Sequence, residues 1–222
     1  MKYLLHGIFQ QDLDGAFPAA ETCVVAPDGL AAAVSLVEDT SLAPSVASLL
    51  DYEKVIEAIH ARQAVIPLRY GCLMESRSAI LRLLENHGQE YRALLGRLRG
   101  NTEMGIRILW PGRPGALPES PLSPGSRYLA SLRSRYGCAG SLAPEEARLA
   151  DQIAVRLAGL YTEQQREVSA SGRGRLLSLY FLTPKTGVER FRHMVPSICP
   201  GSGAKLLLSG PWPPYNFVVS PG

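Results

Sequence analysis

The 222-residue sequence has no apolar run near the ~18 residues that cross a bilayer, which argues against a membrane-spanning segment. Its N-terminal apolar stretch is short and is interrupted by His6, so it does not resemble a signal peptide. The formal net charge is only +3, although the basic residues comprise nineteen Arg and four Lys. So small a charge gives no electrostatic case for nucleic acid as the main partner. The missing span and signal peptide predict no membrane partner and a location in the cytoplasm.

Common motifs of metal binding and catalysis are also missing. Neighbouring cysteines are at least 49 residues apart, which excludes a CxxC motif, and no histidine has a second ligand at metal-binding spacing. Neither GxSxG nor HExxH occurs, and no glycine-rich stretch opens a helix as a phosphate-binding loop does. We therefore predict no metal site, and the sequence gives no positive support for an enzyme. The alternative is a small-molecule-binding or catalytic domain whose site residues come from distant parts of the chain.

The first half of the sequence alternates strand-like and helix-like patterns within a globular composition of 46% hydrophobic residues. It predicts strands over 3–9, 22–25, 29–37 and 64–71 and helices over 51–63 and 75–99. Pro27-Asp28-Gly29 predicts the turn of a hairpin. Asp51 is the expected N-cap of the first helix, and Pro67 marks its strand as an edge or a bulge.

The helix expected over 75–99 carries apolar residues at alternating spacings of four and three, which is typical of a packed helix face. Its members are Ile80, Leu84, His87, Tyr91, Leu94 and Leu98. His87 on this face is expected to be satisfied by a neighbouring residue in a helix–helix contact, not to be a metal ligand. Gly100 is the expected C′ residue.

The second half contains a proline- and glycine-rich loop over 111–126 and further strand and helix patterns. It predicts strands over 104–110, 174–185 and 204–210 and helices over 126–136, 144–168 and 187–195. Pro144 is expected at the start of the long helix, with Glu145 and Glu146 in its first turn. The predicted fold is α+β with long amphipathic helices and two small domains, 1–102 and 103–222. The C-terminal domain is interpreted as a modified ferredoxin-like sandwich with one strand unaccounted for.

Five segments in order resemble the gas vesicle protein F/L family: "DGLAAAVS", "VIPLRYG", "GNTEMGIRILW", "LLSLYFLTPK" and "LLLSGPWPPYNFV". The resemblance extends from Tyr3 to Val219, and its most specific elements are "PLRYG" and "SGPWPPYNF". Tyr70 stands where many relatives are expected to have Phe. An F member is preferred over an L member because the chain is short and lacks a long charged insertion.

This resemblance implies a minor accessory component of gas vesicles, which are hollow, gas-filled protein shells that give aquatic microbes buoyancy. The implied partners are the hydrophobic major shell protein and other accessory gas vesicle proteins. The implied role is to bind the shell protein, limit its aggregation and assist nucleation of the vesicle. The resemblance also implies no cofactor and no catalysis. The implied location is the gas vesicle, with a cytoplasmic stage before assembly.

Residues that contact the partner are expected near the C-terminus, where Pro211, Pro213 and Pro214 interrupt a strand-like run. We expect the prolines to force the chain out of the ladder as a sheet corner, after which 215–219 can rejoin a sheet edge. An exposed edge near 206–219 would then dock the shell protein by strand addition. The candidate partner-binding residues are Leu206, Leu208, Trp212, Tyr215, Phe217 and Arg69.

Two alternatives stay open for these residues. The strand and the helix faces can instead be consumed by the protein's own core, with Trp212 buried there. Arg69 can offer its guanidinium to a carboxylate or phosphate, or it can simply be solvated or paired with a nearby acid.

Overall fold

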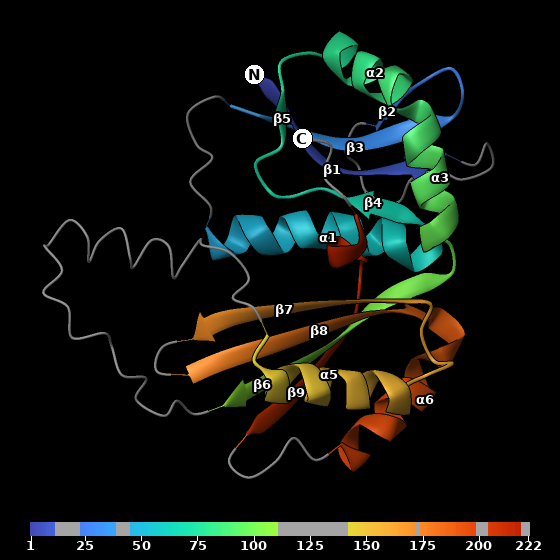
Figure 1. Ribbon diagram of the computed structural model, residues 1–222. Coiled ribbons are helices and arrows are strands. Elements are labelled where there is room, and N and C mark those ends of the chain that lie inside the picture. Colours follow the sequence, from blue (N-terminus) through green and yellow to red (C-terminus); the bar gives the residue numbers. More distant parts are fainter. Residues whose placement is uncertain (12–22, 39–44, 111–141, 172–173, 199–203, 219–222) are drawn as a thin grey trace, which may run out of the picture. The chain divides into compact units, whose positions relative to one another are not determined.

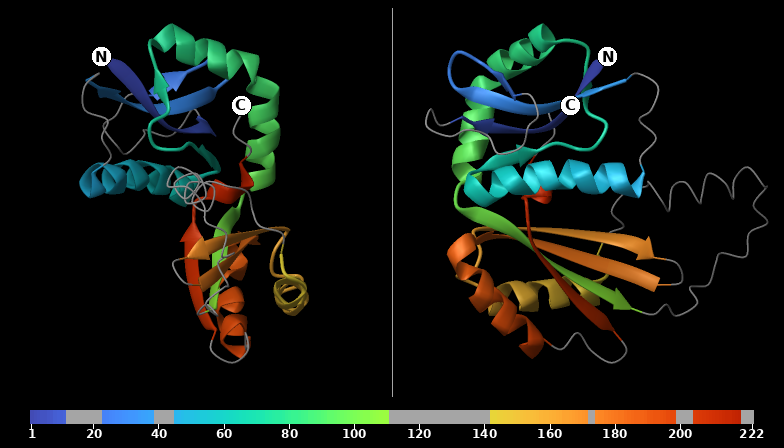
Figure 2. Two further views of the ribbon diagram at one scale, coloured as in Figure 1. Left: turned by 60° about the vertical axis from the view of Figure 1, so that its left-hand side comes forward. Right: turned by 180° about the vertical axis from the view of Figure 1, so that it is seen from behind.

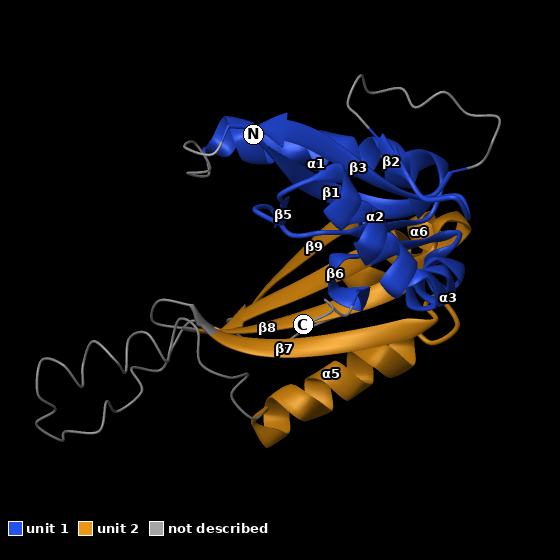
Figure 3. Cartoon of the chain, turned by 90° about the horizontal axis from the view of Figure 1, so that it is seen from above, with its two compact units in different colours: residues 1–103, 212–222 blue, residues 104–211 orange. Residues whose placement is uncertain are grey.

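The computed structural model describes residues 1–11, 23–38, 45–110, 142–171, 174–198 and 204–218 (Figure 1). The chain divides into two compact units, of which unit 1 comprises residues 1–103 and 212–222 and unit 2 comprises residues 104–211 (Figure 3). The segment from Trp212 therefore groups with unit 1, whereas the sequence-based division placed it in the C-terminal domain. The domain limits themselves stay a prediction. The loop over 111–126 and the helix over 126–136 lie outside the described residues.

Unit 1 is built on an antiparallel sheet, four of whose five strands match the expected ones in order, whereas β5 was not predicted. The strands are β1 (Lys2–Gln10), β2 (Cys23–Val25), β3 (Leu30–Val37), β4 (Val65–Pro67) and β5 (Leu73–Met74). Their order is β2-β3-β1-β4, with β5 also paired to β1. The predicted edge position of Pro67 is confirmed, but the strand expected over 64–71 ends at this residue because the chain turns away there.

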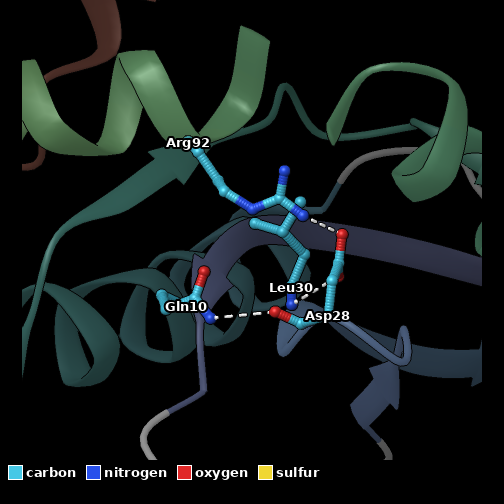
Figure 4. A network of polar contacts seen from close by, with 4 residues as sticks. All are labelled: Gln10, Asp28, Leu30 and Arg92. Atoms are coloured by element: carbon cyan, nitrogen blue, oxygen red, sulfur yellow. Dashed lines mark hydrogen bonds and ion pairs between the residues drawn. The ribbon is translucent and has the colours of Figure 1, made fainter. Parts of the chain in front are cut away.

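The hairpin between β2 and β3 is confirmed, and its turn is fastened to α3 (Gly88–Leu98). Gly29 has φ +83°, a conformation that favours glycine, and Asp28 Oδ1 accepts a hydrogen bond from the Leu30 amide at 3.1 Å. Gln10 Nε2 donates to the Asp28 carbonyl at 3.4 Å, while the other Asp28 carboxylate oxygen pairs with Arg92 of α3 (Figure 4). Asp28 thus joins the turn, the end of β1 and a helix.

Helix α1 (Val46–Arg62) begins five residues before the expected N-cap, so the assignment of Asp51 as N-cap is wrong. Ser45 caps the helix instead. Its hydroxyl oxygen accepts a hydrogen bond from the Ser48 amide at 3.0 Å, and the Ser48 hydroxyl oxygen accepts one from the Ser45 amide. Asp51 pairs with Lys54 one turn on at 2.8 Å. The buried side of α1 packs on the sheet through Tyr52, Ile56 and Ile59.

The helix expected over 75–99 is two helices, α2 (Arg77–Asn86) and α3, which are separated at His87. His87 has φ −111° and ψ 14°, and its Nδ1 lies 3.0 Å from Glu90 Oε2 at the surface. The prediction that a neighbouring residue satisfies His87 is thus confirmed, but His87 lies at the break between the two helices and is half-buried, so it does not continue one packed helix face. The break also shifts the buried positions of α3 to Tyr91, Leu95 and Leu98, leaving Leu94 half-buried. Gly100, with φ +73°, is confirmed as the residue that follows the helix.

Unit 2 contains a second antiparallel sheet of four strands in the order β7-β8-β6-β9. The strands are β6 (Asn101–Trp110), β7 (Glu163–Ser171), β8 (Gly174–Pro184) and β9 (Lys205–Trp212), and the helices are α5 (Pro144–Arg156) and α6 (Val188–Met194). Short 3₁₀ turns, Lys185–Gly187 and Val195–Ser197, flank α6. Strands β6 and β9 cross the division between the units, at Glu103 and Pro211 respectively.

Strand β7 supplies the strand that the sequence interpretation could not place. The helix expected over 144–168 ends at Arg156, and Gly159 with φ +81° turns the chain before β7 pairs with β8 over its whole length. The predicted helix start at Pro144 is confirmed, and Arg175 of β8 forms a bidentate ion pair with Glu146 at 2.5 and 2.7 Å. The ferredoxin-like classification of this unit stays a prediction.

Both helices of unit 2 pack on the same face of its sheet (Figure 2). The shared core contains Ile153 and Leu157 from the α5 side, Phe191 from α6, and alternate residues of β6 and β8. Phe181 of β8 touches both Tyr161 and Phe191, with ring centroids 5.0 and 5.4 Å apart. Among the described helices, none is both long and apolar enough to cross a membrane.

Candidate interaction surface

The C-terminal segment after β9 is held in unit 1 by hydrogen bonds from several elements. Pro213 and Pro214 are buried, and Tyr215–Phe217 form a 3₁₀ turn in which the Phe217 amide donates to the Pro214 carbonyl at 3.1 Å. The expected return of 215–217 to a strand is therefore wrong, because the turn satisfies their backbone locally. The prediction that the prolines force the chain out of the ladder is confirmed for Pro213 and Pro214, which follow the end of β9 at Trp212, but not for Pro211, which lies within β9.

Asn216 is bound by the buried carboxylate of Glu103. The Asn216 amide donates to Glu103 Oε2 at 2.8 Å and its side-chain Nδ2 donates to Oε1 at 2.7 Å. Glu103 is 4% exposed, so two donors supplied by one residue compensate much of the cost of burying its charge. This contact joins residues 113 apart in sequence.

Phe217 is a core residue of unit 1 and not a surface residue. Its side chain is 1% exposed, and its carbonyl accepts a hydrogen bond from Arg97 Nη2 of α3 at 2.6 Å. Tyr215 also packs against the unit 1 core, beside the buried side of α1. Burial raises the pKa of the Tyr215 hydroxyl, and the carboxylates of Glu53, Glu57 and Glu103 raise it further.

Trp212 is the one large apolar side chain of this segment that is exposed, at 44%. Its carbonyl accepts from the Thr102 hydroxyl at 2.8 Å, and His60 Nε2 lies 3.2 Å from the same hydroxyl oxygen. The Thr102 hydroxyl has one proton, which it donates to the Trp212 carbonyl. The His60 imidazole therefore donates to the Thr102 oxygen, so the hydrogen bonds run from His60 through Thr102 to Trp212. The backbone of Trp212 is thus held while its indole meets solvent.

Strand β9 lies at one end of the unit 2 strand order, so one of its edges has no strand partner among the described residues. Leu206 and Leu208 are half-buried and pack against the unit 2 core, whereas Leu207 points the other way and is 59% exposed. The opposite edge strand, β7, carries Glu163, Arg166 and Glu167, but β9 has a charge only at Lys205. Edge strands without charges are prone to pair with another strand.

Arg69 does not join these residues in a described contact. It lies on the turn after β4, where its carbonyl accepts from the Cys72 amide at 3.3 Å, and its side chain is exposed. The six candidate residues therefore separate into core residues of each unit (Leu206, Leu208, Tyr215, Phe217) and exposed ones (Trp212, Arg69).

Sequence reasoning missed two groups of exposed apolar residues. Leu207 was passed over because all three leucines of β9 look alike in sequence, and only its outward orientation distinguishes it. Val46, Leu49 and Leu50 at the start of α1 were missed because the helix was expected to begin at Asp51. The Ser45-x-x-Ser48 pattern was the signal that would have included them.

Ligand-binding clusters are not part of this surface. Within the part of the chain that the structure describes, no group of three His, Cys, Asp or Glu residues is arranged to hold a metal ion. Unit 2 has an open groove of about 550 Å³ between α5 and the turn at Ser197, lined mainly by α5 residues. Its lining includes neither His193 nor another histidine. Burial raises the thiol pKa of both Cys23 and Cys72, which disfavours their reactive thiolates.

The fold is that of solved gas vesicle proteins. The crystal structure of GvpF from Anabaena sp. PCC7120 is similar with a TM-score of 0.71 and 20% identity, over 97% of this chain and 95% of that one. GvpF from Microcystis aeruginosa has a TM-score of 0.70 and 18% identity, over 97% and 98% of the two chains. These similarities establish a mixed α+β architecture with two antiparallel sheets.

The family follows from the sequence match. The model of the gas vesicle synthesis protein GvpL/GvpF family matches residues 4–219, and the chain belongs to this family. Gas vesicle protein F2 of Halobacterium salinarum (strain ATCC 700922 / JCM 11081 / NRC-1) is 22% identical, covering 93% of this chain and 84% of the relative. Gas vesicle protein L of Streptomyces sp. (strain CB03234) is 26% identical, covering 81% and 75%. Relatives of both types match, so the preference for an F member stays a prediction.

Family membership gives the chain a gas-vesicle-associated role and implies association with other gas vesicle proteins. The predicted family is thereby confirmed.

Proposed function

We propose that the chain is an accessory protein that binds the hydrophobic major shell protein, limits its aggregation and assists nucleation of the gas vesicle. Its proposed locations are the cytoplasm before assembly and the gas vesicle afterwards, and it acts without catalysis. The observation that carries this proposal is the edge of β9, which has no charge beyond Lys205 and where Leu207 is exposed and Trp212 ends the strand. An unassembled shell subunit exposes apolar surface and strand edges, and this edge can cover one of them by strand addition.

The first test measures the role itself. The chain is co-expressed with the major shell protein, and the soluble fraction of the shell protein and its co-purification are measured. We expect both to increase several-fold relative to expression of the shell protein alone. No change in either quantity would contradict the assembly role.

The second test locates the contact. Deleting the C-terminal segment is unsuitable because Phe217 and Asn216 belong to the core of unit 1, so we choose Leu207→Lys combined with Trp212→Ala. A lysine at position 207 adds a charge to the part of β9 after Lys205, which carries none, and disfavours pairing. Co-purified shell protein should fall at least about fivefold, corresponding to about 1 kcal/mol. Val155→Lys, at a 75% exposed position of α5, is the control and should retain binding.

Equal binding by the double variant and the control would rule out docking at β9 while leaving the accessory role intact. The alternative of a small-molecule or catalytic site would be favoured by a pocket that gathers Arg69, His87 or His193 with a carboxylate. In the described structure His87 pairs with Glu90 at the surface and Arg69 lies on an exposed turn. No specific observation therefore favours that alternative.

A further inference from the structure

The outer side of α1 carries a stripe that combines exposed apolar residues with unpaired carboxylates. Val46, Leu50, Glu53 and Glu57 are spaced four, three and four residues apart, which places them along one line of the helix. Val46 is 76% exposed, Leu50 is 52% exposed, and Leu49 beside them is 38% exposed. Glu53 and Glu57 are exposed and form no ion pair with a described residue. We call these five residues the α1 stripe.

The neighbouring groups leave the negative charge of the α1 stripe uncompensated. Lys54, the nearest cation on the helix, is already bound to Asp51 at 2.8 Å. Tyr215 of the C-terminal segment lies near enough to Glu53 and Glu57 to sense both carboxylates. Unit 1 as a whole has nine Lys and Arg against thirteen Asp and Glu, a net charge of −4 within a chain of net charge +3.

We propose that the α1 stripe docks an amphipathic helix of another protein, whose apolar residues cover Val46, Leu49 and Leu50 and whose Lys or Arg residues pair with Glu53 and Glu57. From Val46 to Glu57 the stripe extends about 16 Å, so the docked helix needs about three turns. Apolar side chains packed between two helices supply the affinity, and the ion pairs fix the direction of the docked helix.

The chemistry of the stripe excludes other kinds of occupant. A second copy docked on it symmetrically would place Glu53 and Glu57 against the same carboxylates in a parallel arrangement, or against Leu50 and Val46 in an antiparallel one, and neither arrangement gives them a cation to pair with. Helices that lie on anionic membranes carry Lys and Arg beside their apolar residues, whereas this stripe carries acids. A strand cannot be added here, because the backbone of a helix interior is already hydrogen-bonded. A basic amphipathic helix is the occupant that satisfies both parts of the stripe.

This inference goes beyond the proposed function, since it concerns a different surface and does not require the shell protein. The probe is a stapled synthetic helix of about 15 residues. Its leucines have the same spacing as Val46, Leu49 and Leu50, and its two arginines have the same spacing as Glu53 and Glu57. A second peptide carries these residues in the reverse order, for binding in the antiparallel direction. Control peptides carry glutamate in place of arginine. Binding to the full chain is measured by fluorescence anisotropy, and a photo-crosslinker on a leucine position maps the contact by mass spectrometry.

We expect one of the two arginine peptides to bind at least about tenfold more tightly than its glutamate control, with crosslinks on residues 46–57. Glu53→Gln with Glu57→Gln should weaken binding about fivefold and reduce its salt dependence. Leu49→Gln with Leu50→Gln should weaken it about tenfold, since glutamine retains helix propensity while removing apolar surface. The control, Glu85→Gln with Glu90→Gln, removes the same charge from exposed positions of unit 1 and should leave binding unchanged.

The proposal would be overturned if neither arginine peptide bound, or if the crosslinks fell outside residues 46–57. It would also be overturned if Glu53→Gln with Glu57→Gln weakened peptide binding no more than the control pair does. A peptide-free chain that sediments as a dimer, and becomes a monomer with Leu49→Gln and Leu50→Gln, would assign the stripe to a second copy and also overturn it. Circular dichroism of each variant confirms that the fold is retained. Loss of peptide binding leaves the shell-protein test unaffected, so the two proposals fail separately.

Discussion

Phe217→Ala should detach the C-terminal segment from unit 1, because this side chain is the buried anchor of the segment. A phenylalanine buries about 150 Å² or more, which at about 25 cal/mol per Å² gives roughly 4 kcal/mol. The reference chain is already partly collapsed, which lowers the figure to about 3 kcal/mol, within the range measured for Phe→Ala in cores. At 1% exposure, no solvent contact offsets this loss.

Hydrogen exchange followed by mass spectrometry measures this effect locally. If the amides of residues 212–218 exchange through opening of the segment, a loss of about 3 kcal/mol accelerates their exchange roughly 100-fold. Asn216→Ala is the graded comparison: it removes one hydrogen bond to Glu103 but keeps the backbone one, so about 1 kcal/mol and roughly fivefold acceleration are expected. Exchange at 212–218 that is unchanged in Phe217→Ala would refute the assignment of Phe217 to the core of unit 1.

Three further changes test local features. Gly29→Ala should lower the free energy of unfolding, measured with denaturant, by about 1 kcal/mol because the φ of Gly29 is +83°. Gly96→Ala lies inside α3 with open space around the added methyl, so it should raise that free energy by up to about 1 kcal/mol, and equal effects of the two changes would contradict this. Arg175 lowers the pKa of Glu146, so the stability that this pair adds is present above about pH 4.5 and is lost as the pH falls through the lowered pKa. Glu146→Gln should reduce the loss of unfolding free energy at acidic pH, and an unchanged dependence of that free energy on pH would count against the pair. The raised pKa of Tyr215 makes the fold lose stability as the pH rises above about 10, and Tyr215→Phe should reduce that loss in alkaline unfolding.

Much of the fold was predictable where residues typical of turns and helix starts mark the ends of the elements. The β2–β3 hairpin follows from Pro27-Asp28-Gly29, and the start of α5 follows from Pro144. The failures occurred where a periodic pattern was extended through a stop signal. The helix expected over 144–168 was extended past Gly159 into residues that belong to β7. Alternation in β7 is hard to detect because, among the β7 side chains that the structure describes, only Val168 is both apolar and buried.

The candidate site was predictable only in part. The position of the corner follows from the prolines, since proline cannot donate to a ladder. The destination of the segment does not follow, because it depends on Glu103 binding Asn216, a residue 113 positions away in sequence. No local pattern marks a glutamate in a strand as the partner of a distant asparagine. The same limitation hid which leucine of β9 faces outward.

The segment "SGPWPPYNF" therefore combines two roles that its sequence does not separate. Pro213, Pro214 and Phe217 are buried, and Asn216 is bound by Glu103, so most of the segment closes unit 1. Trp212 alone presents a large apolar side chain to solvent from a backbone that Thr102 holds in place. An ordered backbone reduces the entropy lost when an aromatic side chain binds a partner. Substitutions at the buried positions should thus impair binding only by way of folding, whereas Trp212→Ala should impair binding in a protein that remains folded.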